Sequence, residues 1–86
     1  MEKSFTVNSP RLDAVISGVF NLAREKASEL VADGKVAVGG TVATKVAKLL
    51  AEGDVVSVRG HGKFVFAGEG GTSKKGKTYV KIALYK

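Results

Sequence analysis

The side chains of this sequence that could do chemistry are mainly cationic. There is no cysteine, which excludes a disulfide scaffold, a thiolate metal site and a cysteine nucleophile. The single histidine, His61, lies between two glycines in a predicted loop, and alone it can form neither a zinc site nor a catalytic triad. The glycine pairs do not match a phosphate-binding fingerprint, because no strand-to-helix junction surrounds them. We therefore predict that the chain is not an enzyme and binds no metal or other cofactor.

The basic residues are unevenly distributed along the chain. Fourteen Lys and Arg stand against eight Asp and Glu, a formal net charge of +6. Residues 1–58 carry seven basic and seven acidic side chains, whereas residues 59–86 carry seven basic side chains against Glu69 alone and hold the whole excess. A basic segment on a folded domain predicts a polyanionic partner, either nucleic acid or an anionic membrane surface. The alternative is a lysine-rich hairpin that serves solubility.

Two short helices are predicted in the first half of the chain. Ser9-Pro10 is typical of a helix start, and the apolar residues that follow have the spacing of one helical face until about Phe20-Asn21. A second helix is predicted from about Ala23 to Asp33, with Gly34 as its left-handed C-terminal cap. The pair forms an αα-hairpin.

This hairpin positions a first group of cations. Arg11 is predicted near the start of the first helix, and Arg24 and Lys26 near the start of the second, where the positive end of the helix dipole favours phosphate. Lys35 follows the Gly34 cap. Taken singly, Arg24 and Lys26 could be ordinary solvated residues, and Arg11 could pair with a neighbouring carboxylate.

After Lys35 the apolar pattern alternates as in strands. Residues 1–8 are predicted as an extended lead-in, residues 36–43 as two strands around a Gly-Gly turn, and residues 55–59, 64–66 and 78–85 as further strands. Residues 45–51 allow either one helical turn or an anchored loop, and residues 68–76 are predicted as a flexible, lysine-bearing loop. The order of elements predicts an α+β fold with a small, mostly antiparallel sheet.

Four short blocks, taken in order, resemble the S-four-type RNA-binding domain, also called the alpha-L domain. They are Arg11-Leu12-Asp13, Leu22-Ala23-Arg24-x-Lys26-Ala27-x-x-Leu30-Val31, Gly34-Lys35-Val36-x-Val38 and Gly53-Asp54-Val55-Val56-x-Val58. Residues 5–16 and 56–64 are also similar to the carboxy-terminal domain of YlmH-like RNA-binding proteins. The chain departs from the family pattern at Ala23, where a capping serine is usual, and at the Gly39-Gly40 turn, which is usually polar.

The resemblance implies an alpha-L fold, in which a two-helix hairpin packs on a small antiparallel sheet with a C-terminal β-hairpin. Residues 1–8 would be a lead-in, residues 9–58 the S-four-type core, and residues 59–86 a basic β-hairpin extension of the same domain. The implied function is non-catalytic binding of structured RNA, ribosomal or transfer RNA, as the RNA-binding module of a larger ribosome-associated protein. We expect a cytoplasmic monomer without a membrane span, since no apolar run approaches about 18 residues.

The expected RNA-binding residues form two groups. The helical hairpin would contribute the primary contacts and the C-terminal region would extend them: Arg11, Arg24, Lys26 and Lys35, then Arg59, Lys63, Lys74, Lys75 and Lys77. Two alternatives come from other classes of function. The basic surface could bind anionic lipid, or the domain could dock a protein through an exposed edge formed by Val80, Ile82 and Leu84.

Overall fold

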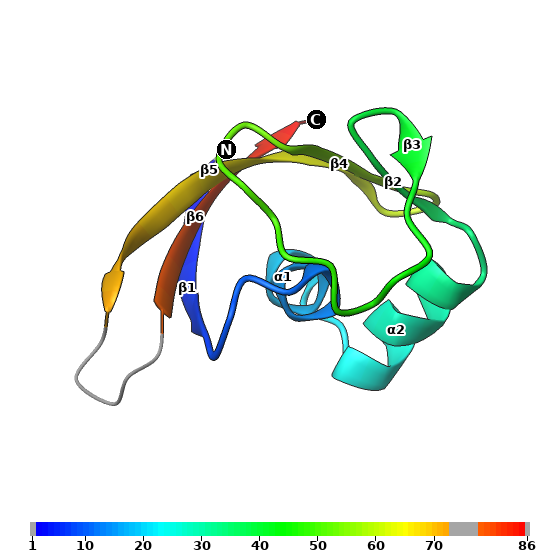
Figure 1. Cartoon of the computed structure of the whole chain (residues 1–86), viewed down its shortest axis with the longest axis horizontal. Coiled ribbons are helices and arrows are strands. Elements are labelled where there is room, and N and C mark those ends of the chain that lie inside the picture. Colours follow the sequence, from blue (N-terminus) through cyan, green and yellow to red (C-terminus); the bar gives the residue numbers. More distant parts are fainter. Residues whose placement is uncertain (1, 73–77, 86) are drawn as a thin grey trace.

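Two helices lie against one face of a single antiparallel sheet (Figure 1). The computed structural model describes residues 2–72 and 78–85. Its elements are β1 (Glu2–Val7), α1 (Leu12–Phe20), α2 (Arg24–Ala32), β2 (Val36–Val38), β3 (Thr41–Val42), β4 (Val55–Val58), β5 (Gly62–Thr72) and β6 (Thr78–Tyr85). The strands are ordered β1-β6-β5-β4-β2-β3, and each neighbouring pair is antiparallel. This arrangement confirms the predicted α+β fold.

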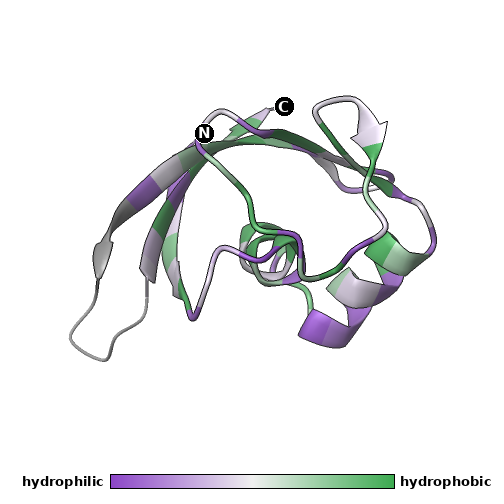
Figure 2. Cartoon of the chain, in the orientation of Figure 1, coloured by the Kyte–Doolittle hydropathy of each residue, from purple (hydrophilic) through white to green (hydrophobic). Residues whose placement is uncertain are grey.

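The hydrophobic core fills the space between the helices and the concave face of the sheet. Because side chains alternate along a strand, every second residue of the central strands faces α1, and Val56, Phe64 and Ile82 are buried there. The buried residues of α1 include Leu12 and Ile16. Figure 2 shows the first turn of α2 in the hydrophilic colour, at the end of the helix that holds Arg24 to Lys26. The convex face of the sheet carries neither helix (Figure 1).

The predicted N-terminal lead-in is an edge strand. Residues 2–7 form β1, which pairs with β6 along its whole length and approaches α1 closely. A Cβ at Gly18 of α1 would lie 2.3 Å from the ring of Phe5, so only glycine allows this approach. The Lys3 ammonium donates a hydrogen bond of 2.8 Å to the carbonyl of Val19, near the negative C-terminal end of α1.

The predicted start of α1 is wrong by two residues. Arg11, not Ser9, occupies the N-cap position, and it makes no side-chain capping bond. The loop of residues 45–50 instead supplies acceptors for the first N–H groups of the helix. The N–H of Leu12 donates to the carbonyl of Lys48 at 2.8 Å, and the N–H of Asp13 donates to the carbonyl of Val46 at 3.2 Å. This loop is the anchored alternative predicted for residues 45–51.

Strand β5 is longer than predicted. Gly68 to Thr72, expected to be part of a loop, continue β5 and pair with β6, with register shifts between Phe66 and Gly68 and between Glu69 and Gly71. The pairing uses backbone groups, which glycine supplies as well as any residue. Strand β6 therefore lies inside the sheet between β1 and β5, with Val80 and Ile82 buried. The alternative of a protein-docking edge at these residues is wrong.

The C-terminal end of α2 follows the prediction. Gly34 has a φ of +74°. Its N–H bonds the carbonyl of Val31 at 3.1 Å, and the N–H of Lys35 bonds that of Leu30 at 3.0 Å. This Schellman-type ending turns the chain directly into β2, so the end of the helix and the start of the strand are fixed together.

Candidate nucleic-acid interface

A buried carboxylate, Asp13, joins the two arginines of the helical hairpin. The Asp13 side chain is 5% exposed, and its Oδ2 accepts a hydrogen bond from Arg24 Nη2 at 3.1 Å and one from Arg11 Nη2 at 3.3 Å. Arg11 Nε lies 3.3 Å from Oδ1. The Ser28 hydroxyl donates a hydrogen bond of 3.4 Å to Oδ2, and the Ala14 N–H donates one of 2.8 Å to Oδ1. Asp13 thus holds two guanidinium groups from different elements in one place.

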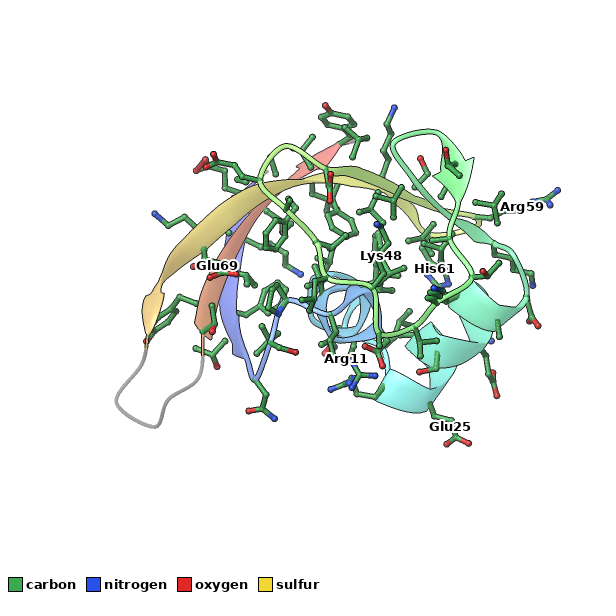
Figure 3. The ribbon with its side chains drawn as sticks, in the orientation of Figure 1. Arg11, Glu25, Lys48, Arg59, His61 and Glu69 are labelled. Atoms are coloured by element: carbon green, nitrogen blue, oxygen red, sulfur yellow. The ribbon has the colours of Figure 1, made fainter. Side chains whose placement is uncertain are left out.

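Both arginines remain open to solvent on their other sides. The side chains of Arg11 and Arg24 are 39% and 52% exposed. Each guanidinium has five N–H donors in a planar fork, so several remain free for an anion, and two arginines with one aspartate leave a net charge of +1. In Figure 3 the Arg11 side chain lies beside α1 on the side away from the sheet. The arrangement suits a phosphate group.

The connection between the helices places Arg24 within reach of Asp13. Asn21 adopts a left-handed conformation with a φ of 56°, and the N–H of Leu22 bonds the carbonyl of Ser17 at 3.0 Å. The Ser17 hydroxyl donates to the carbonyl of Leu22 and fixes the same turn. Ala23 then precedes α2 without a capping side chain, as its position in the sequence predicted.

The dipole argument does not apply to α1. The N–H groups of Leu12, Asp13 and Ala14 are bonded to Lys48, Val46 and the Asp13 carboxylate, so they are not available to a ligand. The attraction of the Arg11 region for phosphate must come from the guanidinium itself.

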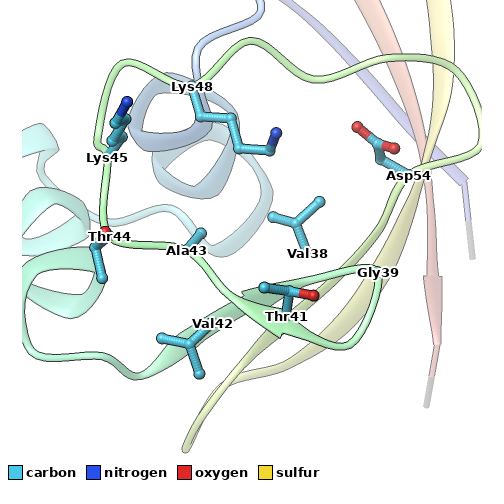
Figure 4. A pocket seen from close by; sticks show the side chains of 9 residues that line it. All are labelled: Val38, Gly39, Thr41, Val42, Ala43, Thr44, Lys45, Lys48 and Asp54. Carbon is cyan, nitrogen blue, oxygen red and sulfur yellow. The ribbon is translucent and has the colours of Figure 1, made fainter.

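Two further lysines, which the sequence reasoning missed, lie in the loop beside Arg11. Arg11 forms a β-bridge with Leu49, and this bridge brings the exposed residues Lys45 and Lys48 to the start of α1. The loop and β3 enclose an open hollow of about 530 Å³ (Figure 4). It is lined by Val38, Gly39, Thr41, Val42, Ala43, Thr44, Lys45, Lys48 and Asp54. The ambiguous secondary structure of residues 45–51 concealed these cations.

The Lys48 side chain extends across this hollow in the direction of Asp54 (Figure 4). Asp54 itself has a structural role, because its Oδ2 accepts the N–H of Ala51 at 2.9 Å and closes the turn before β4. The hollow is therefore lined by two lysines, Lys45 and Lys48, by the carboxylate of Asp54, and by the apolar residues Val38, Val42 and Ala43.

A second cationic pair lies at the other end of α2. The N–H of Arg59 donates to the carbonyl of Lys35 at 2.8 Å, next to the pairing of Val36 with Val58, so the two exposed residues are neighbours. Figure 3 shows Arg59 projecting outward. Since a nine-residue helix is about 14 Å long, this pair stands apart from the Arg11–Arg24 pair. Lys26 is exposed on the first turn of α2, at the same end of the helix as Arg24.

The remaining predicted site residues do not join these clusters. Lys63 lies on β5 with its ammonium 5.4 Å from the ring centroid of Tyr85, on the convex face. Lys74, Lys75 and Lys77 lie outside the described residues. His61 packs at the β4–β5 turn with its ring centroid 5.6 Å from that of Phe20.

Metal-ligand groups and membrane-spanning helices are both missing from the part of the chain that the structure describes. Within 2–72 and 78–85 there is no group of three or more His, Cys, Asp or Glu side chains that could hold a metal ion. No helix in the same part of the chain is long and apolar enough to cross a membrane.

Comparison with known proteins agrees with this geometry. The S4 domain profile matches residues 10–56, which is more than half of the chain. The chain is also 39% identical over 81 residues to the ribosome-associated protein quality control protein P2 of Bacillus subtilis (strain 168). This alignment covers 94% of the chain but 32% of the relative, so the chain spans about a third of that protein's length. The chain belongs to the S4 domain family, whose module is an RNA-binding, non-catalytic domain, and this confirms the family predicted from the sequence.

Proposed function

We propose that this domain binds structured RNA, ribosomal or transfer RNA, through the surface around Arg11 and Arg24. The observation that supports this most is the shared carboxylate of Asp13, which fixes two half-exposed guanidinium groups side by side. Positioned guanidinium groups bind phosphate oxygens more selectively than mobile lysines do, because less side-chain freedom is lost on binding.

The other described cations extend this surface. Lys45 and Lys48 lie in the loop that bridges to Arg11, and Lys26 lies on the first turn of α2. Lys35 with Arg59 forms a second contact region about one helix length away. Two separated groups of cations suit two stretches of a folded RNA backbone. Recognition would then depend on the shape of the RNA, as is usual for double-stranded regions. In the proposal, Lys74, Lys75 and Lys77 add attraction for any polyanion.

The relative suggests the setting in which this binding would occur. Its name describes a ribosome-associated protein, and the chain matches about a third of it. We propose that the domain is the RNA-binding module of a larger ribosome-associated protein in the cytoplasm, acts as a monomer and catalyses no reaction.

Three single substitutions test the role of the arginine pair. Each disrupts the contact between Arg24 and Asp13, but each changes the net charge of the protein differently. Arg24→Gln lowers the charge by one, Arg24→Lys keeps it, and Asp13→Asn raises it by one. If the positioned guanidinium groups bind the RNA, all three weaken the binding of ribosomal RNA fragments by about tenfold, a loss of about 1.4 kcal/mol.

Circular dichroism and urea unfolding of each variant show whether the fold is retained. If affinity instead followed net charge, so that Asp13→Asn bound RNA more tightly than the wild type, the surface would be a general basic patch and the proposal would fail. Vesicles with increasing anionic lipid test the membrane alternative, which predicts binding that rises with lipid charge and resists competition by RNA.

A further inference from the structure

Both tyrosines of the chain lie on the convex face of the sheet. On β6, Tyr79, Lys81 and Tyr85 alternate with the buried residues Val80 and Ile82, so the first three face away from the helices. The residues Tyr79 and Tyr85 are 45% and 49% exposed. The chain has no tryptophan and no other tyrosine. The uncovered face of the sheet thus carries the two aromatic residues that are best suited to contacts with a polar ligand.

Cations accompany the rings on this face. Lys63 of β5 pairs with Tyr85 in the register of the sheet, and its ammonium lies 5.4 Å from the ring centroid. Lys81 is exposed between the two tyrosines. The ion pairs found among residues 2–72 and 78–85 both involve Asp13, on the other side of the molecule. The convex face therefore combines π surfaces with two lysines, and Glu2 of β1 adds one carboxylate near Lys81 without forming an ion pair among the described residues.

Packing between strands does not account for the two rings. Tyr79 lies opposite Thr6 on β1 and Gly71 on β5, and neither residue has a side chain large enough to cover an aromatic ring. The Tyr85 ring lies beside the Lys63 ammonium, and about half of the residue is exposed. A face retained only for solubility has no need of half-exposed tyrosines.

We propose that this convex face is a second RNA-binding surface, which takes unpaired nucleotides. Bases would stack on Tyr79 and Tyr85, while Lys63 and Lys81 would contact the adjoining phosphates. Stacking on aromatic rings beside cations is how proteins bind single strands with little sequence preference. Six residues of strand separate the two rings by about 20 Å, so one strand of several nucleotides is needed to reach both. This surface is independent of Asp13 and the arginine pair.

The composition of the chain provides a specific probe. The chain contains two tyrosines, Tyr79 and Tyr85, and no tryptophan, so its intrinsic tyrosine emission reports on this face alone. The 86-residue chain is titrated with a dye-labelled oligoadenylate of about eight nucleotides, within the site sizes known for single-strand binders. Anisotropy of the dye measures affinity, and quenching of the tyrosine emission detects stacking.

Conservative and disruptive substitutions separate stacking from charge. We expect Tyr85→Leu and Tyr79→Leu each to lower the affinity for oligoadenylate by about tenfold, whereas Tyr85→Phe and Tyr79→Phe, which keep a ring, leave it within about twofold. An abasic strand of equal length should bind more weakly than oligoadenylate and leave the tyrosine emission unchanged. Each variant is first checked by circular dichroism, and the phenylalanine variants keep the test valid if a leucine variant unfolds.

The proposal is overturned if the Tyr→Leu variants bind oligoadenylate as the wild type does, or if the abasic strand binds equally well. Arg24→Gln separates this proposal from the proposed function. It should weaken binding of structured RNA but leave oligoadenylate affinity within about twofold, because the two surfaces lie on opposite sides of the sheet. Loss of oligoadenylate binding in Arg24→Gln would place the single strand on the arginine surface and refute the convex site.

Discussion

At the scale of single residues, two positions on α1 have opposite requirements. Asp13 needs a long list of partners, because a buried carboxylate must be paired and hydrogen-bonded, and it has two arginines, Ser28 and a backbone N–H. Gly18 needs the absence of a side chain, since the ring of Phe5 occupies the space where a Cβ would lie. The first position builds the proposed RNA surface, and the second holds β1 against the helix.

Gly18→Ala should therefore destabilise the domain, although alanine is the better helix former by about 1 kcal/mol. Three ring atoms of Phe5 lie within 2.7 Å of the added carbon, and overpacking of this kind typically costs about 1–3 kcal/mol. We expect a net decrease of about 1 kcal/mol in the free energy of unfolding, measured with urea.

A double-mutant cycle tests the cause. In a Phe5→Leu background the clash is relieved, so Gly18→Ala should be neutral or stabilising there. Equal destabilisation in both backgrounds would show that the contact with Phe5 is not the reason for glycine at this position.

At the scale of elements, the loop of residues 45–50 replaces the usual side-chain cap of α1. Its carbonyls accept the N–H groups of Leu12 and Asp13, and the N–H of Leu50 donates to the carbonyl of Pro10 at 2.9 Å. The buried side chain of Leu50 attaches the loop to the core, whereas its neighbour Leu49 is 61% exposed. The position of Arg11 thus depends on a loop more than thirty residues later in the chain.

Two adjacent leucines provide a matched comparison of this anchor. Leu50→Ala should lower the free energy of unfolding by about 2–5 kcal/mol, because it leaves a cavity in the core. Leu49→Ala should change it by less than about 0.5 kcal/mol, because that side chain is mostly in solvent. Chemical denaturation of both variants measures the difference. Similar values for the two would mean that the loop is not anchored through Leu50.

The sequence was sufficient to predict elements whose signals are local. The Gly34 cap, the alternation along β6 and the α+β class follow from residues close together in the chain, and the structure has each of them. The predicted start of α1 is wrong because Ser9-Pro10 is a good local signal for a helix start. The helix begins two residues later, where carbonyls distant in the sequence accept hydrogen bonds from its first N–H groups. The Gly-rich end of β5 was misjudged for the same kind of reason, since its partner strand is what orders it.

The candidate site was predictable as a set of residues but not as an arrangement. The family motif contains Arg11, Asp13 and Arg24, yet local reasoning treated a carboxylate partner for Arg11 as a rival to RNA binding. A carboxylate partner is compatible with a binding role, because Asp13 positions the side chains of Arg11 and Arg24 while both stay partly exposed. Lys45 and Lys48 were missed because their place beside Arg11 depends on a bridge between distant residues.

At the scale of the whole molecule, the net charge of +6 is concentrated in residues 59–86. Attraction at a distance depends on this total, whereas contacts that fix the position of the RNA depend on ordered side chains such as Arg24. The two properties can therefore be separated by substitution.

Replacing Lys74, Lys75 and Lys77 with Gln removes three of the six excess charges. We expect slower association with structured RNA and a shallower salt dependence, since log affinity falls by about 0.9 for each phosphate contact per log unit of salt in duplex DNA. The ratio of specific to non-specific affinity should change little. Stopped-flow association and titrations at several salt concentrations measure both quantities.

A collapse of the specificity ratio would assign these lysines to recognition. Unchanged association and salt dependence would leave them a role in solubility alone.

The pairing of β1 with β6 also determines when this domain can finish folding. Phe5, at the start of the chain, lies opposite Val80, near its end, so the sheet closes only through contacts between residues almost a full chain length apart. Closing so large a loop is entropically costly, and folds rich in distant contacts form slowly. Within this domain, β1 is synthesised before its partner β6 and must wait for that strand. Until then the inner edge of β5 and the ring of Phe5 remain exposed, and a nascent chain halted before β6 would offer both to chaperones or to other unfinished chains.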